Sequence, residues 1–113
     1  MIVQAPGDTV ENIVNEITAP ELATLGADAT IIDVREQGEW DQARIGGSVL
    51  IPMSEFVDRI AELPKDETLY ILCATGNRSG RVAAYLENEG FNAVNVAGGI
   101  VAWQGAGHPI ERD

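Results

Sequence analysis

Short apolar runs alternate with helix-forming segments along this chain, and this alternation constrains its fold more than any other feature. The runs over 30–33, 49–51, 68–72 and 93–96 have the length of β-strands, and helical patterns separate them. Strands that alternate with helices are joined by crossovers and pair in parallel. The pattern therefore predicts an α/β domain with a mostly parallel sheet. A chain of 113 residues has the length of one domain.

Local signals predict where the helices begin and end. Thr18 is expected to cap a helix after a short edge strand at 16–17, with Pro20 in its first turn, Glu21 as capping-box partner and Gly26 as its end. Further helical segments are predicted over 37–42, between a cap at Ser54 and a stop at Pro64, over 79–89, and after Gly98-Gly99. Residues 1–15 are predicted to be an N-terminal extension, with a short helix capped by Asp8 or a strand, and 16–113 a single domain.

Composition excludes several classes of function. The net charge of −11, with a single lysine among seven basic residues, argues against nucleic-acid binding because phosphates would be repelled. No apolar run approaches the roughly 18 residues that cross a bilayer, and the N-terminus lacks the pattern of a secretory signal. One cysteine and one histidine permit neither an intrachain disulfide nor a zinc cluster. We expect a soluble, cytoplasmic protein with no membrane, metal or cofactor.

The segment Cys73-Ala74-Thr75-Gly76-Asn77-Arg78-Ser79 is the most informative part of the chain. It joins the strand over 68–72 to the helix predicted from Ser79, and ligand sites in α/β sheets form where strands end. Gly76 and Asn77 allow the backbone to curl, so that several N–H groups point inward near the positive end of the helix. The segment therefore predicts an anion-binding nest with a thiol at its centre.

Such a nest would lower the pKa of the Cys73 thiol and hold the residue as a thiolate. A thiolate can attack the outer sulfur of a donor such as thiosulfate, and the sulfite that leaves needs no proton. This chemistry needs no general base, which fits a chain with one histidine. The alternative is that Cys73 is a small buried hydrophobic residue at a strand end. The glycine and the helix start that follow argue against it, because a core cysteine needs no anion nest.

Four segments resemble the rhodanese family, in order, over about residues 16–111. These are 31–36 with Glu39-Trp40, 45–52, the loop Cys73–Ser79, and 98–100 with Trp103 and 108–110. The resemblance implies a five-stranded parallel sheet flanked by helices on both faces, with the loop at its carboxyl edge. It also implies that Cys73 is the nucleophile and carries a persulfide, and that the backbone N–H groups of Ala74 to Arg78 bind it.

The resemblance further implies supporting roles. Arg78 is expected to aid anion binding, and Ser79 completes the loop. Asp33 and Arg35 match signature positions with a structural role, such as a pair between Arg35 and Glu39 that fastens the strand end to the next turn. Arg44 stands where the family often has histidine, which adds positive charge at the pocket mouth or at the surface.

The implied activity is that of a thiosulfate sulfurtransferase. Sulfur would pass from thiosulfate or a persulfide donor to cyanide, a small thiol or a thioredoxin-like protein. Two alternatives remain open. One is a non-catalytic binding or redox-sensing module, in which Cys73 would form sulfenic acid. The other is a cysteine phosphatase, but that class places arginine six residues after its cysteine, whereas Arg78 lies five after Cys73.

Overall fold

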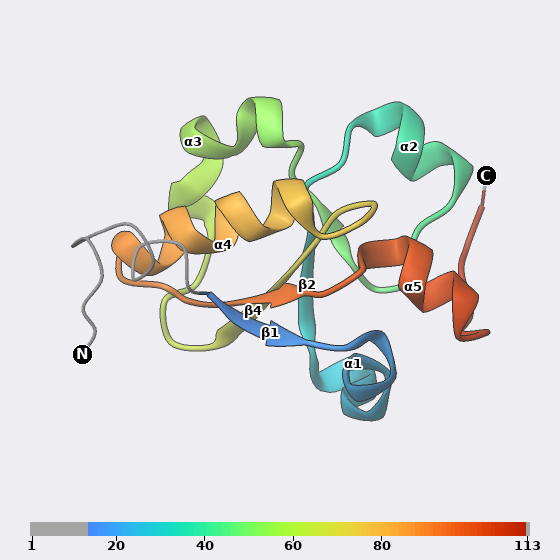
Figure 1. Ribbon diagram of the computed structural model, residues 1–113. Helices are drawn as coiled ribbons and strands as arrows, with labels where there is room; N and C mark the ends of the chain where they lie inside the picture. The colour runs from blue at the N-terminus through green and yellow to red at the C-terminus, as the bar shows by residue number, and fades with distance from the viewer. Residues whose placement is uncertain (1–13, 113) are drawn as a thin grey trace.

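The computed structural model describes residues 14–112 and forms a five-stranded parallel sheet with helices on both faces (Figure 1). This confirms the predicted fold class. The strands are β1 (Asn15–Ile17), β2 (Thr30–Asp33), β3 (Val49–Leu50), β4 (Thr68–Leu72) and β5 (Asn92–Val96), and the helices are α1 (Ala19–Leu25), α2 (Gln37–Gln42), α3 (Phe56–Arg59), α4 (Asn77–Asn88) and α5 (Gly99–Gly105). The sheet order is β1-β5-β4-β2-β3.

Each face of the sheet has its own apolar core. One core packs α3 and α4 on the sheet and includes Ile71, Cys73, Val82 and Leu86. The other lies under α1 and α5 and includes Leu22, Leu72, Ile100 and Trp103. Neighbouring residues of β4 point to opposite faces, so Ile71 and Leu72 belong to different cores. Burial on both faces explains why the strand sequences are continuous apolar runs.

The predicted start and end of α1 are confirmed. The Thr18 side chain accepts a hydrogen bond from the backbone N–H of Glu21, and the Glu21 carboxylate accepts one from the backbone N–H of Thr18. Gly26 ends the helix with a φ of 60°, a conformation that favours glycine. This reciprocal capping satisfies backbone donors that a helix start would otherwise leave unpaired.

The helix predicted between Ser54 and Pro64 was wrong in its form. The segment is a succession of short turns, with 3-10 helices Met53–Glu55 and Ile60–Glu62 on either side of the four-residue α3. Ser54 does not cap it, because its hydroxyl donates to the Glu36 carboxylate at 3.0 Å. The Ser54 hydroxyl, which the local pattern predicts as a helix cap, therefore binds a carboxylate 18 residues away in the chain instead.

The helix after the cysteine begins two residues earlier than predicted. Helix α4 starts at Asn77 and has Gly76, with φ of 102°, as its N-cap. Asn77 is already helical and its φ is not positive, so the turn of the loop does not use the backbone freedom expected at this residue. The curl of the loop thus depends on Gly76, and the helix N-terminus lies closer to Cys73 than the sequence pattern suggested.

Two further expectations concern the N-terminal extension and the absence of a membrane-spanning helix. The helix or strand expected in the N-terminal extension falls almost entirely on residues 1–13, which lie outside the described residues. Between residues 14 and 112, no helix has both the length and the apolar character required to cross a membrane.

Candidate functional site

Cys73 follows the last residue of β4 and lies at the carboxyl edge of the sheet, where the sequence placed it. Its side chain is buried, with 1% of its surface exposed. The Gly76 N–H donates to the Cys73 Sγ at 3.1 Å, and the Ser79 hydroxyl lies 3.2 Å from the same sulfur. The sulfur is thus surrounded by donors from its own loop and from the first turn of α4.

These donors outweigh the cost of burying a charge. Burial raises the pKa of the Cys73 thiol, whereas hydrogen bonds from the Ser79 hydroxyl and from the backbone N–H groups of Ser79, Gly76 and Thr75 lower it. The net result is a pKa below the usual value for cysteine. A lowered pKa increases the thiolate fraction at neutral pH, and the thiolate is the nucleophilic form.

The rest of the predicted loop contributes mainly through its backbone. The Cys73 and Ala74 carbonyls point toward α5 and accept from the backbone N–H groups of Ile100 and Val101, at 2.9 and 3.1 Å. These bonds fix the loop on the N-terminus of α5. Thr75 and Asn77 have exposed side chains, and the side-chain and loop hydrogen bonds to the sulfur within the described residues come from Gly76 and Ser79 instead. Their contribution to the loop is therefore through the backbone.

Arg78 forms an ion pair with Glu39, a partner that the sequence did not predict for it. Its two terminal nitrogens donate to the two Glu39 carboxylate oxygens, both at 2.9 Å. This bidentate pair lowers the pKa of Glu39 to about 2 and raises that of Arg78. Both terminal nitrogens of Arg78 are therefore already hydrogen-bonded, and the guanidinium faces a carboxylate of opposite charge.

Asp33 and Arg35 form a buried pair at the end of β2. The Arg35 Nη2 lies 2.8 Å from an Asp33 carboxylate oxygen, and both side chains are at most 5% exposed. Arg35 also donates to the backbone carbonyls of Glu39 and Ala43. The predicted pairing of Arg35 with the Glu39 carboxylate was therefore wrong, because that carboxylate is taken by Arg78. Arg35 nevertheless fastens the strand end to α2, through backbone atoms.

The departure from the family pattern at Arg44 is accommodated beside Trp40. The Arg44 guanidinium lies 5.3 Å from the Trp40 ring centroid and donates to the Trp40 carbonyl at 3.1 Å. The Arg44 backbone also bridges to Glu111. The substituted residue therefore links α2 to the C-terminal tail.

Two residues of the site were not identified from the sequence. Asn95 of β5 is buried, accepts from the Ser79 hydroxyl at 2.6 Å and donates to the Glu16 carboxylate at 3.0 Å. The available signal was a polar residue at a buried position of an apolar strand. Glu16 carries no such signal, because it is a charged residue on an edge strand and comes close to Asn95 only through the pairing of β1 with β5.

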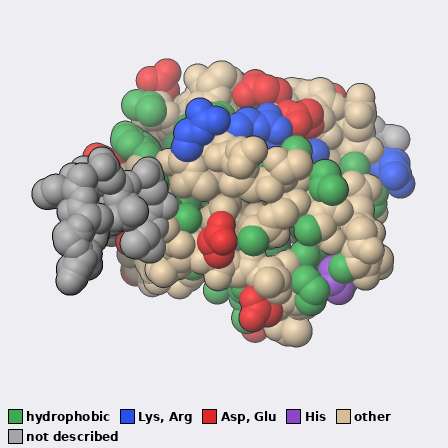
Figure 2. All heavy atoms as spheres, viewed as in Figure 1, with side chains coloured by type: hydrophobic (Ala, Val, Ile, Leu, Met, Phe, Trp, Pro, Cys, Tyr) green, Lys and Arg blue, Asp and Glu red, His purple; other side chains and the backbone are tan. Residues whose placement is uncertain are grey.

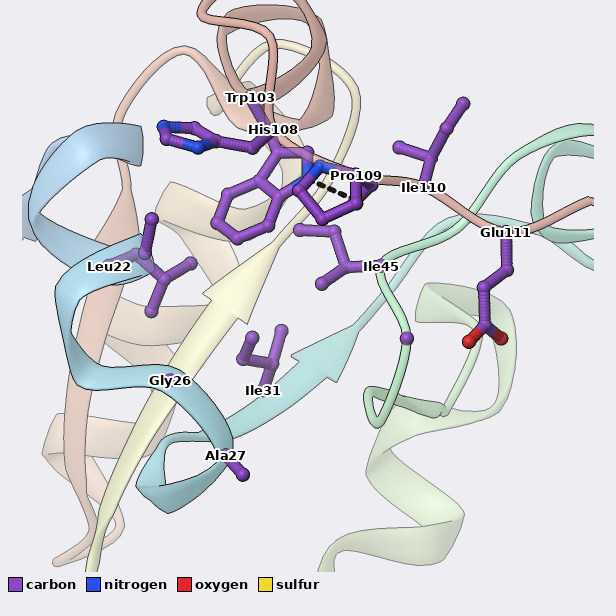
Figure 3. Close-up of a pocket in the computed structure, with 12 residues that line it drawn as sticks. Leu22, Gly26, Ala27, Ile31, Ile45, Trp103, His108, Pro109, Ile110 and Glu111 are labelled. Carbon is purple, nitrogen blue, oxygen red and sulfur yellow. Dashed lines mark hydrogen bonds between the residues drawn. The ribbon is translucent and has the colours of Figure 1, made fainter.

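Cavities lie on both sides of the molecule. One, of about 420 Å³, adjoins the loop and is lined in part by Glu16, Gly76, Arg81 and Asn95. The larger, of about 470 Å³, is apolar and lies between α1, α5 and the C-terminal tail (Figure 3). None of the residues that line the larger cavity belongs to the Cys73 loop, whereas Gly76 and Asn77 of the loop line the smaller one. Within residues 14–112, no three potential metal ligands of the His, Cys, Asp and Glu types cluster to hold an ion.

The fold and the site together define a class of protein: a single α/β unit that presents a low-pKa cysteine in a short loop at the end of a parallel strand. A family model, the Rhodanese-like domain, matches residues 18–106. The chain therefore belongs to the rhodanese-like domain family.

Individual relatives agree with this assignment. A sulfurtransferase of Allochromatium vinosum is 37% identical over 102 residues, covering 87% of this chain and 95% of that protein. The crystal structure of a rhodanese-related protein from Thermoplasma volcanium superposes with a TM-score of 0.84 at 34% identity, covering 88% of this chain and 99% of the other. A rhodanese-like domain protein from Staphylococcus aureus gives a TM-score of 0.80 at 38% identity, with 88% and 98% covered. These similarities support rhodanese-type sulfur transfer as the general activity.

Proposed function

We propose that this protein moves sulfane sulfur from thiosulfate or a persulfide donor to a thiol acceptor or cyanide, through a persulfide on Cys73. The observation that supports this most directly is the set of donors around a buried sulfur at a strand end. Gly76 and Ser79 supply hydrogen bonds that stabilise negative charge on that sulfur. A cysteine with a purely structural role would not need them.

The first half-reaction consumes the donor. The Cys73 thiolate attacks the outer sulfur of thiosulfate, a new S–S bond forms, and the original S–S bond breaks so that sulfite leaves with the electron pair. No proton is transferred and no oxidant is needed. The product is a persulfide whose negative charge lies mainly on the outer sulfur. The loop N–H groups of residues 74–78 are proposed to bind that sulfur, in a setting close to the N-terminus of α4.

The second half-reaction needs an acceptor from outside the chain. The sequence holds one cysteine, so no second thiol within it can take up the sulfur. The acceptor thiolate attacks the outer sulfur, and Cys73 leaves as a thiolate that the same donors stabilise. A small thiol or a thioredoxin-like protein would supply this nucleophile, and cyanide would replace it in an assay.

The supporting residues have distinct proposed roles. Arg78 and Glu39 connect the first turn of α4 to α2 and so hold the loop in shape, while Asp33 and Arg35 do the same for the end of β2. The Glu39 carboxylate offsets the positive charge of Arg78, so the proposed aid of Arg78 to anion binding is weakened while the pair is intact. We propose a cytoplasmic setting, because a free thiol persists where thiols are kept reduced.

The test is an assay of the purified protein with thiosulfate and cyanide, in which thiocyanate is measured. We expect turnover from the native protein and a loss of at least about a hundredfold in Cys73→Ala, since removal of a nucleophile abolishes covalent catalysis. Circular dichroism of the variant shows whether its fold is retained. Equal background signals from both proteins would rule out thiosulfate:cyanide transfer, and polysulfide and glutathione persulfide would then be tested as donors.

Mass spectrometry of the thiosulfate-treated protein separates sulfur transfer from redox sensing. Sulfur transfer predicts that Cys73 gains one sulfur atom and loses it again when a thiol acceptor is added. A gain of oxygen alone, without transfer, would support a sensing role. Hydrolysis of a chromogenic phosphate ester would instead support the phosphatase alternative.

A further inference from the structure

Asn95 is held in one orientation by two oxygen atoms. It is 3% exposed, and its Nδ2 donates to the Gly76 carbonyl at 3.2 Å and to the Glu16 carboxylate at 3.0 Å. Rotation of the amide by 180° would place Oδ1 against both acceptors. The Asn95 Oδ1 therefore faces the Ser79 hydroxyl, at 2.6 Å.

The Ser79 hydroxyl consequently lies between two acceptors. It is 2.6 Å from the Asn95 Oδ1 and 3.2 Å from the Cys73 Sγ, and Ser79 itself is fully buried. A serine hydroxyl carries one proton and can donate one strong hydrogen bond at a time. Among the described residues, no other donor reaches Asn95 Oδ1. The two acceptors therefore compete for a single proton.

We propose that Asn95 is a positioning residue that competes with Cys73 for the Ser79 proton, so that the hydroxyl turns to the free thiolate and turns back to Asn95 once the persulfide has formed. The return of the hydroxyl to Asn95 in the persulfide rests on the proposed function. The hydrogen bonding proposed for the thiol and the thiolate does not. Glu16 and the Gly76 carbonyl fix the amide that makes this competition possible.

The three states of Cys73 require different hydrogen bonding. As a thiol, Cys73 can donate to the Ser79 oxygen while Ser79 donates to Asn95, and every group is satisfied. As a thiolate, the sulfur needs the Ser79 proton, and Asn95 Oδ1 loses its donor. In the persulfide, the inner sulfur is bonded to a second sulfur and carries little charge, so the hydroxyl returns to Asn95. Asn95 thereby disfavours the free thiolate and favours the sulfur-loaded state.

Other charged groups lie around Cys73 and Asn95. Arg78, paired with Glu39, lies on α4 and α2, and the Asp33–Arg35 pair lies at the end of β2. Glu16 of β1 contacts Asn95, and Arg81 of α4 lines the adjacent cavity. The two ion pairs and Arg81 make no hydrogen bond to Ser79 or Asn95, and Glu16 loses its Asn95 partner both in Asn95→Ala and in the double variant, so a double-mutant cycle isolates the competition.

The test is the pH dependence of Cys73 alkylation by iodoacetamide, without any sulfur donor, in native protein, Ser79→Ala, Asn95→Ala and the double variant. We expect Ser79→Ala to raise the apparent pKa of Cys73 and Asn95→Ala to lower it, each by about one unit. In the double variant, the pKa should equal that of Ser79→Ala alone, because Asn95 acts only through the hydroxyl. Asn95→Ala leaves the Gly76 carbonyl with a partner, the Gly80 N–H at 3.1 Å.

Asn92→Ala is the matched control. Asn92 lies on the same strand but donates to Thr68 and is exposed, so its removal should leave the Cys73 pKa unchanged. The proposal is overturned if Asn95→Ala raises the pKa, or if it shifts the pKa as much without Ser79 as with it. Because no sulfur donor is present, these results do not depend on the transfer assay.

A measurement on the native protein covers the case in which Asn95→Ala does not fold. The side-chain amide NMR signals of Asn95 should move with the same apparent pKa as Cys73 ionisation, and should return toward the thiol-state position in the persulfide. In Ser79→Ala this movement should vanish, while the Asn92 amide signals serve as an internal reference. Asn95 signals that stay fixed through thiolate formation would refute the competition.

Discussion

The Arg78–Glu39 pair shows how contacts across the fold change the role of a loop residue. Considered alone, an arginine five residues after Cys73 is a natural anion ligand. In the folded protein the Glu39 carboxylate, 39 residues earlier in the chain, accepts hydrogen bonds from both terminal nitrogens of that arginine. The pair lies at the surface, with the Glu39 side chain 38% exposed, so its net contribution to stability is small.

Replacement of Glu39 by glutamine tests this contribution through its pH dependence. The folded-state pKa of about 2 lies below the usual value of 4.5, so the carboxylate stabilises the fold fully above pH 4.5. The contribution is lost as pH falls from 4.5 to 2. We expect Glu39→Gln to lower the free energy of unfolding by up to about 1 kcal/mol at pH 7, measured by urea denaturation.

The same comparison at lower pH provides the decisive result. The difference between native protein and Glu39→Gln should shrink as pH approaches 2, where the native carboxyl becomes protonated. Glu89→Gln, a variant of an exposed residue that forms no ion pair within residues 14–112, should give almost no difference at any pH. A Glu39→Gln difference that is the same at pH 7 and pH 2 would contradict an ionic origin.

The structure brings the predicted residues together where they are contiguous in the sequence. Cys73, Gly76 and Ser79 lie within one short segment, so the spacing alone brings donors and sulfur together. Asn95 and Glu39 reach the site from distant positions, and their contacts depend on sheet order and helix packing. A buried asparagine in a strand indicates some polar partner, but the sequence does not identify Ser79 as that partner.

Among the elements, the N-terminus of α5 is the support on which the loop rests. Gly99 has a φ of 58°, and a Cβ at this position would overlap the carbonyl oxygens of Cys73 and Ala74. Only a residue without a side chain allows α5 to approach the loop so closely. The short helix predicted at Gly98-Gly99 is confirmed, but the sequence pattern does not indicate what the start of this helix contacts.

Gly99→Ala should therefore damage both stability and activity. We expect a loss of about 3 kcal/mol in the free energy of unfolding, from overpacking and from the positive φ, together with reduced sulfur transfer. Gly105→Ala, at the other end of the same helix, meets no atom within 4 Å and should be neutral or slightly stabilising. Chemical denaturation of the two variants provides the comparison. Equal effects would show that the approach of α5 to the loop is not tight.

Element prediction was accurate where the determinants are local and inaccurate where they are not. Thr18 and Glu21 cap α1 within one turn, so the sequence pattern was sufficient. Ser54 has the same capping chemistry, but folding places Glu36 within its reach, and the predicted cap does not form. The early start of α4 follows from Gly76, whose left-handed backbone lets the helix begin at once.

At the scale of the whole molecule, the net charge of −11 affects the approach of an anionic donor. Basic side chains form a band across the upper part of the face shown in Figure 2, with acidic side chains beside them. Arg78 within the site is already paired with Glu39. A dianion such as thiosulfate therefore approaches against the net field of the protein.

Ionic strength should reveal this repulsion. Raising it from about 0.01 to 0.15 M shortens the screening length from about 30 to 8 Å. We expect kcat/KM for thiosulfate to rise about two- to threefold, while the rate constant for alkylation of Cys73 by the neutral reagent iodoacetamide stays constant. A decrease for thiosulfate would show that local positive charge governs donor binding instead.

The complete sheet order could be predicted only in part. Alternating strands and helices predict parallel pairing, and the family resemblance adds the number of strands. The local pattern contains nothing that places β1 beside β5, because the two strands have no signal in common. This pairing is also what brings Glu16 to Asn95.

The pairing of the first strand with the last has a consequence for how the protein is made. A chain synthesised from its N-terminus must carry residues 15–17 without their neighbours until residues 92–96 have been added. Contacts this distant in sequence form late, because a long loop must close before they contribute. The surroundings of Cys73 are then completed only after residues 92–96 have been synthesised, so a nascent chain would present this cysteine before Asn95 is in place.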